Sequence, residues 1–107
     1  MYKNDRERMI IMQLKSRDIH DLRILKAMST VLRELFVSED QSNLAYEDYP
    51  LPISYGQTIS QPYIVAYMTE ALQLKASDKI LEIDTGSGYQ AAILAEICQE
   101  LHRLGDY

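Results

Sequence analysis

Apolar residues at three- and four-residue intervals predict that the first third of the chain is helical. Between Asn4 and Arg17 there is no glycine or proline, and good helix formers predominate. A second helix is predicted to begin near Asp21, because apolar residues then recur on one helical face. This predicted stripe comprises Leu22, Leu25, Met28, Leu32 and Leu35. We interpret both segments as amphipathic helices that pack against a core.

The pattern changes over residues 38–60, where no helical or alternating period persists. Pro50, Pro52 and Gly56 interrupt this stretch, which is much longer than the usual connection of about 4–6 residues. Its composition is too apolar for a solvated linker, so we predict a long, ordered loop. The segment SEDQ at 38–41 has the spacing of a capping box and favours a short helical turn within that loop.

A proline-containing junction predicts the start of a third helix. Ser60 can cap this helix with its hydroxyl, and Pro62 can occupy the first turn without losing a hydrogen bond. We expect the helix to extend to about Leu74. Its predicted apolar face comprises Ile64, Val65, Met68 and Leu72.

A strand, a glycine turn and a last helix are predicted after it. Residues 79–83 form a short β-favouring run, and the turn Thr85-Gly86-Ser87-Gly88 follows. Ser87 and Gln90 have the spacing of a capping box at the start of the last helix. The predicted apolar face of that helix comprises Ala91, Leu94, Ala95 and Cys98.

Length and charge exclude several classes of protein. The 107 residues allow one ordinary domain, and eleven basic against sixteen acidic residues give a net charge of -5. Without a basic stripe, a nucleic-acid binder is not expected. The apolar run Met9–Met12 is too short for a signal peptide or a membrane span, so we expect a cytoplasmic protein without a membrane partner.

Neither the histidines nor the single cysteine indicates chemistry. His20 and His102 lack the spaced companions of a metal site, so no metal is expected. Cys98 has no second cysteine with which to form an internal disulfide, and its place on an apolar helical face favours a small core residue over a nucleophile.

The glycine turn has two interpretations. A glycine-bearing turn between a strand and a helix brings backbone N–H groups and the helix dipole to a bound anion or cofactor. Such turns are also common for conformational reasons alone. No Gly-Lys-Ser/Thr follows as in a phosphate-binding loop, and Ala91 stands where a full G-x-G-x-x-G requires glycine. Spacing alone therefore leaves a cofactor site and a structural turn equally open.

The residues from Pro50 to Glu96 resemble one family closely. PLPISYGQTISQP, LEIDTGSGY and the upstream segment RDIHDLRILKAMSTV are similar to the N-terminal half of the protein-L-isoaspartate O-methyltransferases. GQTISQP is far more specific than any glycine spacing, and the resemblance extends from about Asn4 to about Leu101. It implies transfer of a methyl group from S-adenosylmethionine to the carboxyl group of an L-isoaspartyl residue in proteins or peptides.

The same resemblance implies an α/β fold, a truncated Rossmann-like methyltransferase. Residues 1–60 would supply N-terminal helices and a substrate-side loop, and residues 61–107 the incomplete start of the Rossmann-like domain. Ser60 takes the place of the catalytic serine, and Thr58, Ile59 and Tyr55 that of substrate-binding residues. The implied cofactor-binding residues are Gln61, Glu82, Asp84, Thr85, Gly86, Ser87 and Gly88.

The implied reaction needs positioning more than acid–base chemistry. A carboxylate with an ordinary pKa of about 3.3–3.7 is already ionised at neutral pH, so no strong base is required. In-line alignment and exclusion of water can lower the barrier by about 7–11 kcal/mol. A serine hydroxyl can hold the carboxylate without competing as a nucleophile, and this suits Ser60. Tyr46, Tyr49, Tyr55 and Tyr63 are weaker candidates for a pocket wall, since ordinary packing explains them equally well.

Two departures from the family pattern affect these expectations. Asp84 stands where the family usually has glycine, and its carboxylate would approach and repel the carboxylate of the cofactor. Ser54 replaces a common glycine more mildly. The chain also stops after the helix that follows the first motif, so we expect an N-terminal fragment that is inactive alone. The alternative is a non-catalytic module whose unpaired strand drives homo-oligomerisation, element swapping or capture of a complementing fragment.

Overall fold

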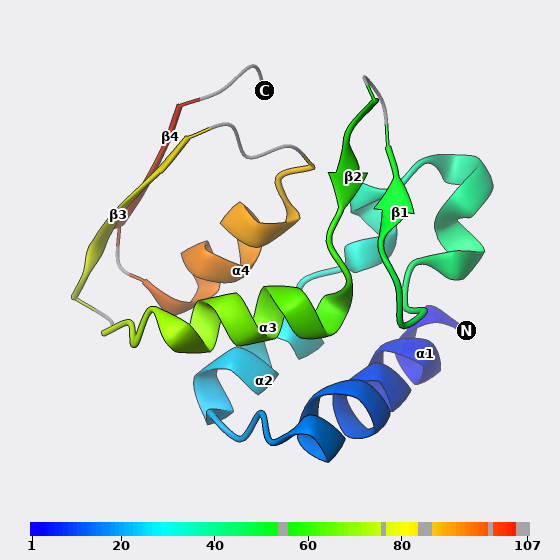
Figure 1. Cartoon of the computed structure of the whole chain (residues 1–107), viewed down its shortest axis with the longest axis horizontal. Helices are drawn as coiled ribbons and strands as arrows, with labels where there is room; N and C mark the ends of the chain where they lie inside the picture. Colours follow the sequence, from blue (N-terminus) through cyan, green and yellow to red (C-terminus); the bar gives the residue numbers. More distant parts are fainter. Residues whose placement is uncertain (54–55, 76, 84–86, 99, 105–107) are drawn as a thin grey trace.

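The computed structural model describes residues 1–53, 56–75, 77–83, 87–98 and 100–104, with backbone only for 80–83 and 100–104. Figure 1 shows a hairpin at one end of α3 and a two-stranded sheet at the other. The α-helices are α1 (Tyr2–Met9), α2 (Leu22–Thr30), α3 (Pro62–Ala71) and α4 (Tyr89–Ile97). The strands are β1 (Leu51–Pro52), β2 (Thr58–Ile59), β3 (Lys79–Ile83) and β4 (Glu100–Leu104). The shorter helical turns are η1 (Ile10–Leu14), η2 (Lys15–Arg17), η3 (Arg33–Phe36) and η4 (Glu39–Leu44).

The first predicted helix is confirmed, with changes of helix type along it. α1 continues into η1, a π-helical turn, and into η2, a 3-10 turn. The helical run ends at Asp18, which has a left-handed φ of 68°. Met9, Ile10 and Leu14 are buried, whereas Ile11 and Met12 are exposed. The N-terminal run therefore presents one narrow apolar face to the core.

The second helix is confirmed, but its predicted stripe is wrong in part. Asp21 caps α2 by accepting a hydrogen bond from the backbone N–H of Arg23 at 2.9 Å. The helix ends at Thr30 because Val31 is extended, so the period cannot continue to Leu32 and Leu35. Both of these leucines and Leu22 are exposed. The buried residues are Ile24, Leu25, Ala27 and Met28.

The predicted loop contains regular structure. η4 confirms the helical turn after Ser38, although the Ser38 side chain makes no capping hydrogen bond. β1 and β2 form an antiparallel hairpin that pairs Leu51 with Ile59 and Pro52 with Thr58. Leu51 and Ile59 are buried and their neighbours are exposed, which is the alternation of a strand with one face on the core. Two residues per strand were too few for the sequence pattern to reveal.

The third helix begins and ends differently from the prediction. The residue that flanks α3 is Gln61, not Ser60, and no side chain caps the helix. α3 ends at Ala71, short of the predicted Leu74, and Gln73 has a left-handed φ of 51°. Of the predicted apolar face only Val65 is buried, because the helix turns Val65, Ala66 and Thr69 to the core. Ile64, Met68 and Leu72 are 37%, 54% and 56% exposed.

The strand at 79–83 is confirmed, but it has a partner that the sequence did not reveal. β3 pairs in parallel with β4, with Lys79 opposite Glu100 and Ile83 opposite Leu104. α4 connects the two strands, which makes a β-α-β unit. The expectation of a lone strand followed only by a helix is therefore wrong.

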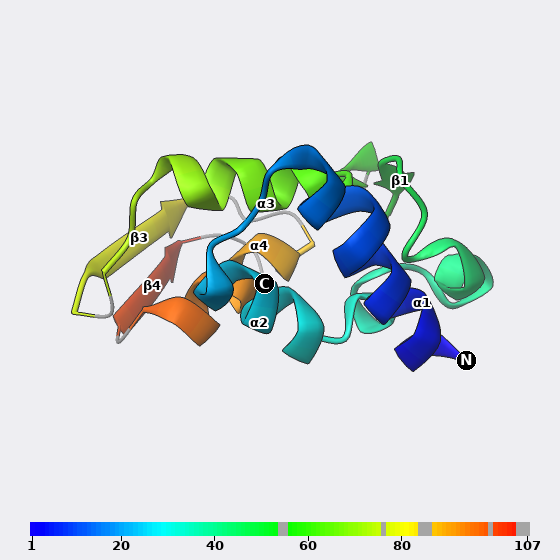
Figure 2. The ribbon, with the colours of Figure 1, turned by 90° about the horizontal axis from the view of Figure 1, so that it is seen from below.

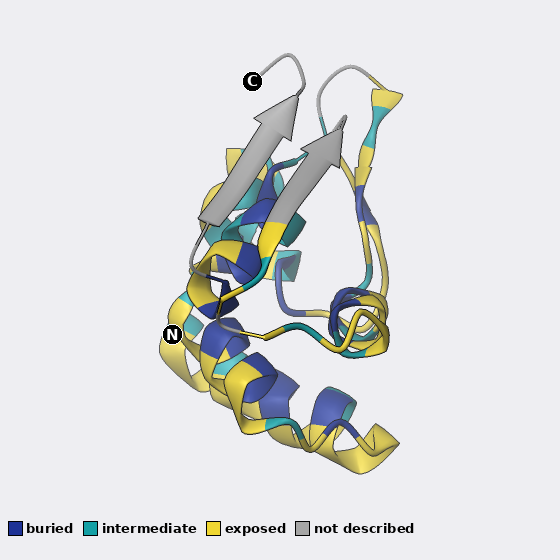
Figure 3. Ribbon diagram, turned by 90° about the vertical axis from the view of Figure 1, so that its left-hand side faces the viewer, coloured by how far each residue is buried: buried dark blue, intermediate teal, exposed yellow. Residues whose placement is uncertain are grey.

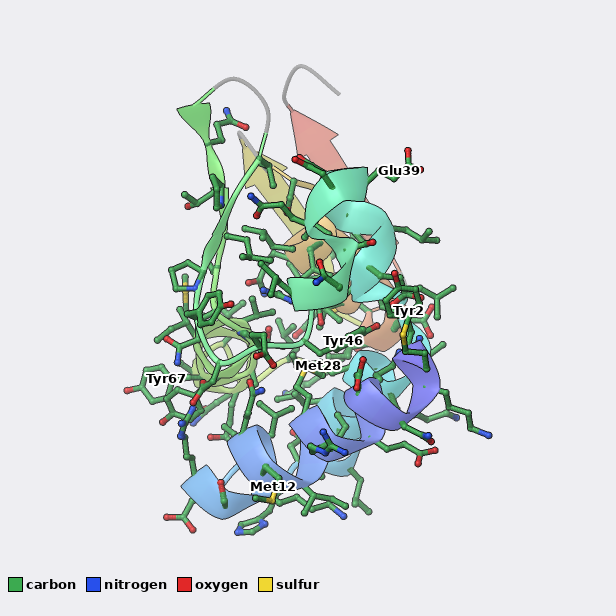
Figure 4. The ribbon with its side chains drawn as sticks, turned by 90° about the vertical axis from the view of Figure 1, so that its right-hand side faces the viewer. Tyr2, Met12, Met28, Glu39, Tyr46 and Tyr67 are labelled. Carbon is green, nitrogen blue, oxygen red and sulfur yellow. The ribbon has the colours of Figure 1, made fainter. Side chains whose placement is uncertain are left out.

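The core lies where the helices meet. α2 packs against both α3 and α4, and α4 packs in turn against β4. In the view from below, α3 runs along one side of the molecule (Figure 2). The Cα radius of gyration is 13.2 Å, close to the about 13 Å of a compact 100-residue domain. Burial is concentrated on the inner faces of the helices (Figure 3), and Tyr46 and Met28 lie inside while Met12 and Tyr67 lie at the periphery (Figure 4).

Candidate functional site

The end of β2 presents the predicted catalytic residue to solvent. Thr58 and Ser60 are exposed, whereas Ile59 between them is 1% exposed and belongs to the core. This alternation follows from the two-residue period of extended backbone, which fixes Ile59 as an anchor. The Ile59 side chain therefore has no surface for a substrate, and only its backbone is left for such a contact. Pro62 then begins α3, so Ser60 is held between a strand and a helix start.

A buried arginine supports Ser60 from inside. The Nη2 of Arg33 donates to the Ser60 carbonyl at 2.8 Å, and its Nε donates to the Ala45 carbonyl. Its guanidinium carbon lies 4.9 Å from the centre of the Tyr89 ring. Burial lowers the pKa of the Arg33 guanidinium, while Tyr89 and Tyr46 act in the opposite direction. Arg33 thus joins the Ser60 junction to the first residue of α4.

An exposed ion pair holds the next residue. Asp48 accepts hydrogen bonds from both terminal nitrogens of Arg17 and, at 2.8 Å, from the side-chain amide of Gln61. The hydrogen bonds from Arg17 and Gln61 lower the pKa of Asp48 to about 2. The Arg17 guanidinium carbon also lies 5.4 Å from the centre of the Tyr63 ring. Gln61, predicted to bind the cofactor, is therefore oriented by Asp48.

The glycine turn leads into α4 in a conformation that requires glycine. Gly88 is buried, with a φ of 85°, directly before the helix. The Ser87 hydroxyl accepts a hydrogen bond from the Tyr89 N–H at 3.1 Å. The predicted capping box is wrong, because Gln90 donates instead to the Thr69 hydroxyl at 2.8 Å and so ties α4 to α3.

The remaining predicted residues of the cofactor and substrate sites are only partly visible. Glu82 lies on β3, where the backbone alone is described. Tyr55, Asp84, Thr85 and Gly86 lie outside the described residues, as does Ser54. Their assigned roles stay predictions. The residues brought together in the described part are Ser60 and Gln61, and Arg33 connects them with Tyr89 beside the glycine turn.

A second polar network fixes the segment behind the hairpin. The Tyr46 hydroxyl accepts hydrogen bonds from Nε of Arg6 at 2.8 Å and from the backbone N–H of Arg33 at 3.0 Å, and it donates to Glu34. Burial and the hydrogen bond to Glu34 raise the pKa of Tyr46 to about 12. Burial of Glu34 opposes its ionisation, but Tyr46 and Arg6 outweigh that effect and its pKa lies below the ordinary value.

Three of the four tyrosines of the predicted pocket wall differ in burial, and the fourth, Tyr55, lies outside the described residues, so the wall stays a prediction. Tyr46 is a core residue, Tyr49 is 42% exposed, and Tyr63 lies beside Arg17. Two cavities in the described part of the chain lie beside α1, and neither is lined by Ser60 or Gly88. These two cavities therefore do not mark a substrate site at Ser60.

The residues that were set aside in the sequence behave as structural or surface residues. Cys98 is 7% exposed, and burial raises the pKa of its thiol, which confirms a core role. His20 is exposed beside Asp18. Among the described residues, no group of three or more histidine, cysteine, aspartate or glutamate side chains has the geometry of a metal site. Over the same part of the chain, no helix combines the length and apolarity needed to cross a bilayer.

Two solved structures define the class of protein to which the fold belongs. A structure of a protein-L-isoaspartate O-methyltransferase matches 95% of this chain and 34% of its own, with a TM-score of 0.82 and 27% identity. A second, from Plasmodium falciparum and in complex with S-adenosyl-L-homocysteine, matches 88% of this chain and 40% of its own, with a TM-score of 0.68 and 30% identity. Both are methyltransferases, and the fold of this chain is part of theirs.

Sequence comparison gives the family. The model of the Protein-L-isoaspartate(D-aspartate) O-methyltransferase (PCMT) family matches residues 4–104, and the chain belongs to this family. A protein-L-isoaspartate O-methyltransferase from Opitutus terrae is 60% identical over 101 residues, which are 94% of this chain and 43% of the relative. One from Synechococcus is 55% identical over 103 residues, 96% of this chain and 42% of the relative. The chain thus spans less than half the length of these curated relatives.

Sequence reasoning missed three residues of the site. Arg33, Asp48 and Tyr89 orient the predicted site residues through the contacts described above. Charged residues are almost never fully buried unless paired, so nothing in the sequence marked Arg33 as an interior group. Asp48 lies in the stretch that showed no period, so no sequence pattern singled it out.

Proposed function

We propose that this chain carries the methyl-acceptor side of a protein-L-isoaspartate O-methyltransferase that uses S-adenosylmethionine in protein repair. The observation that carries the proposal is the exposed Ser60 at the strand-to-helix junction, held from inside by Arg33. Membership of the PCMT family supports the same assignment. The substrate class is a protein or peptide with an L-isoaspartyl residue.

On the acceptor side, the chain binds and orients a carboxylate. The Ser60 hydroxyl donates a hydrogen bond to a carboxylate that is already ionised, so the serine need not act as a base. Thr58 is exposed on the same side of the extended segment and supplies a second hydroxyl. The contribution of these residues is alignment of the reacting oxygen with the methyl donor.

On the cofactor side, the described residues fit a bound S-adenosylmethionine. Gly88 is buried at the start of α4, where its left-handed φ of 85° disfavours a side chain and leaves the backbone open to close approach. The positive end of a helix dipole favours a carboxylate at such a position. When bound, the cofactor supplies a sulfonium-activated methyl group. Ser87, Gly88 and Gln61, together with the predicted Glu82, Thr85 and Gly86, would hold it.

Two features bear on whether the chain acts alone. It spans 43% of the Opitutus terrae relative, so more than half of that relative's length has no counterpart in these 107 residues. Asp84 adds a carboxylate where the family pattern has glycine, which opposes the carboxylate of the cofactor. We therefore expect the isolated chain to be inactive, and we expect Asp84→Gly to raise its affinity for S-adenosylmethionine in calorimetry.

A grafted enzyme tests the proposed function directly. Residues 4–104 replace the matching segment of the Opitutus terrae relative, and transfer of a labelled methyl group to a synthetic L-isoaspartyl peptide is measured. The graft should methylate this peptide and not its L-aspartyl isomer, and Ser60→Ala should reduce kcat/KM by about 10²-fold, the scale of a lost donor at a reacting oxygen. A folded graft with no transfer, or one indifferent to Ser60→Ala, would contradict the assignment.

Self-association is a second candidate function, favoured by the outer face of α3. Ile64, Tyr67, Met68 and Leu72 are all more than a third exposed on one helix, and clustered apolar surface of this kind is typical of an interface. The partner would be a second copy of the chain. Light scattering should then give a dimer that Met68→Lys converts to a monomer, and a monomeric wild type would exclude this candidate.

The cytoplasmic location stays a prediction that cell fractionation would test.

A further inference from the structure

Arg33 is an unusual interior residue. Its side chain is fully buried, with an exposed fraction of 0%. Within the described part of the chain, no carboxylate forms an ion pair with it, whereas Arg6, Arg17 and Arg23 each have one. Transfer of a charge from water into an interior is expensive unless it is paired. A positive charge that is buried there with no carboxylate partner among the described residues therefore has a role beyond packing.

The contacts of Arg33 point toward the site. The two described hydrogen bonds of its side chain go to the carbonyls of Ala45 and Ser60, and its guanidinium carbon lies 4.9 Å from the centre of the Tyr89 ring. Among the described residues, its Nη1 and the Tyr89 hydroxyl are both buried without a hydrogen-bond partner, and Tyr89 favours the charged form of Arg33. The cation thus lies between the Ser60 backbone and the start of α4, and no carboxylate of the described residues pairs with it.

We propose that Arg33 is a positioning residue that fixes the Ser60 junction against α4 and, through its buried charge, favours an anionic group at Ser60. The inference rests on the proposed function, because the anion is the isoaspartyl carboxylate. Arg33 touches neither substrate nor cofactor, so it acts through the Ser60 backbone and through its electric field. In a medium of low dielectric constant that field is weakly screened.

If Arg33 has this role, its replacement can lower the affinity for the isoaspartyl peptide without lowering the stability of the fold. Replacing Arg33 by methionine keeps most of the side-chain volume, so it avoids the cavity that truncation leaves and costs only the hydrogen bonds to two carbonyls. Arg33→Met should therefore stay folded while it loses the contact to the Ser60 carbonyl and the charge. If Arg33 only stabilised the fold, its replacement would lower the melting temperature and the peptide affinity together.

The first measurement follows the NMR chemical shift of the Ser60 carbonyl carbon. In the isotope-labelled chain, Arg33→Met should shift the Ser60 carbonyl carbon resonance upfield, since a charge-assisted hydrogen bond is lost, and Arg33→Lys should restore part of the shift. Arg23→Met is the matched control, because Arg23 is an exposed arginine paired with Asp21. If the Ser60 carbonyl carbon has the same chemical shift in Arg33→Met as in Arg23→Met, the proposal is overturned.

The second measurement reads the carboxylate. A synthetic L-isoaspartyl peptide is titrated into the wild type and the variants, with its L-aspartyl isomer as reference. Arg33→Met should weaken binding of the isoaspartyl peptide about tenfold, the loss expected for one hydrogen bond that involves a charged group. Arg33→Lys should recover part of this affinity, and Arg23→Met should leave it unchanged. An unchanged affinity, or a loss that follows the melting temperature in every variant, would overturn the proposal.

The remaining outcomes are also decisive. If the wild-type chain binds neither peptide, the titration is made with the graft, and a graft that binds neither peptide refutes the proposed function, while the Ser60 resonance still decides whether Arg33 positions the junction. If Arg33→Met does not fold, Arg33→Gln takes its place, because its amide can reach a carbonyl but carries no charge. It should then keep part of the Ser60 shift yet lose the peptide affinity, and retention of that affinity would count against the role of the charge.

Discussion

Two adjacent residues, Ser60 and Gln61, are held by two arginine clusters that differ in burial. Arg33 is 0% exposed and holds the Ser60 carbonyl without a carboxylate partner among the described residues. Arg17 and Asp48 have side chains 37% and 38% exposed, and through Asp48 they hold the Gln61 amide. An interior contact of this kind is rigid and expensive to break, whereas a surface pair contributes about 0–1 kcal/mol. We infer that the junction is anchored at Ser60 and adjustable at Gln61.

Truncating each arginine should give the largest difference between the clusters. Arg33→Ala leaves a cavity and two carbonyls without their donor, so we expect a loss of about 3–5 kcal/mol in the free energy of unfolding. Arg17→Ala should cost less than about 1 kcal/mol. Urea unfolding followed by circular dichroism measures both. Equal losses would remove the distinction between anchor and adjustable contact.

The second-largest effect is expected at alkaline pH, which should lower the stability of the buried cluster around Arg33 and Tyr89. Burial raises the pKa of Tyr89 to about 12, above the about 10 of an unfolded tyrosine. Because the pKa is higher in the folded state, Tyr89 contributes to the free energy of unfolding. This contribution is fully present below pH 10, and about 2–3 kcal/mol is lost as the pH rises toward 12. Tyr89→Phe should remove the share of this pH dependence that belongs to Tyr89, leaving that of Tyr46, and should remove one late step from the tyrosinate absorbance titration. An unchanged late step in Tyr89→Phe would show that Tyr89 ionises normally.

Acid pH should affect the exposed cluster least. The hydrogen bonds from Arg17 and Gln61 lower the pKa of Asp48 to about 2, so its contribution is present above the unfolded value near 3.9 and is lost as the pH falls through about 2. Because the pair is exposed, we expect less than about 1 kcal/mol. Asp48→Asn should be less stable than the wild type at pH 6 and equal to it near pH 2. A gap between the two that persists at pH 2 would contradict this.

Local pattern was sufficient to predict the helices, the strand at 79–83 and the glycine at the start of α4. It failed where long-range packing decides the outcome. Ile64, Met68 and Leu72 form a regular apolar stripe, yet α3 turns Val65, Ala66 and Thr69 inward, because Thr69 there bonds to Gln90 of α4. Period alone does not say which side of a largely apolar helix meets the core.

The candidate site divides in the same way. Ser60 and Gly88 could be recognised from the sequence as junction residues, since Ser60 precedes a proline-led helix and Gly88 follows a strand, but their roles in binding stay predictions. Arg33 was not, because its role depends on contacts with residues 12 or more positions away. The strand β4 was missed for a similar reason, since five residues near the end of the sequence acquire strand geometry only by pairing with β3.

Steady-state kinetics of the graft carrying Arg33→Met, set beside the same graft carrying Arg23→Met, test the central claim most directly. The account predicts that kcat/KM for the L-isoaspartyl peptide falls about tenfold or more with Arg33→Met, that Arg33→Lys recovers part of the loss, and that Arg23→Met changes it by less than about twofold. Equal activity of the Arg33→Met and Arg23→Met grafts would contradict the claim that the buried arginine positions Ser60.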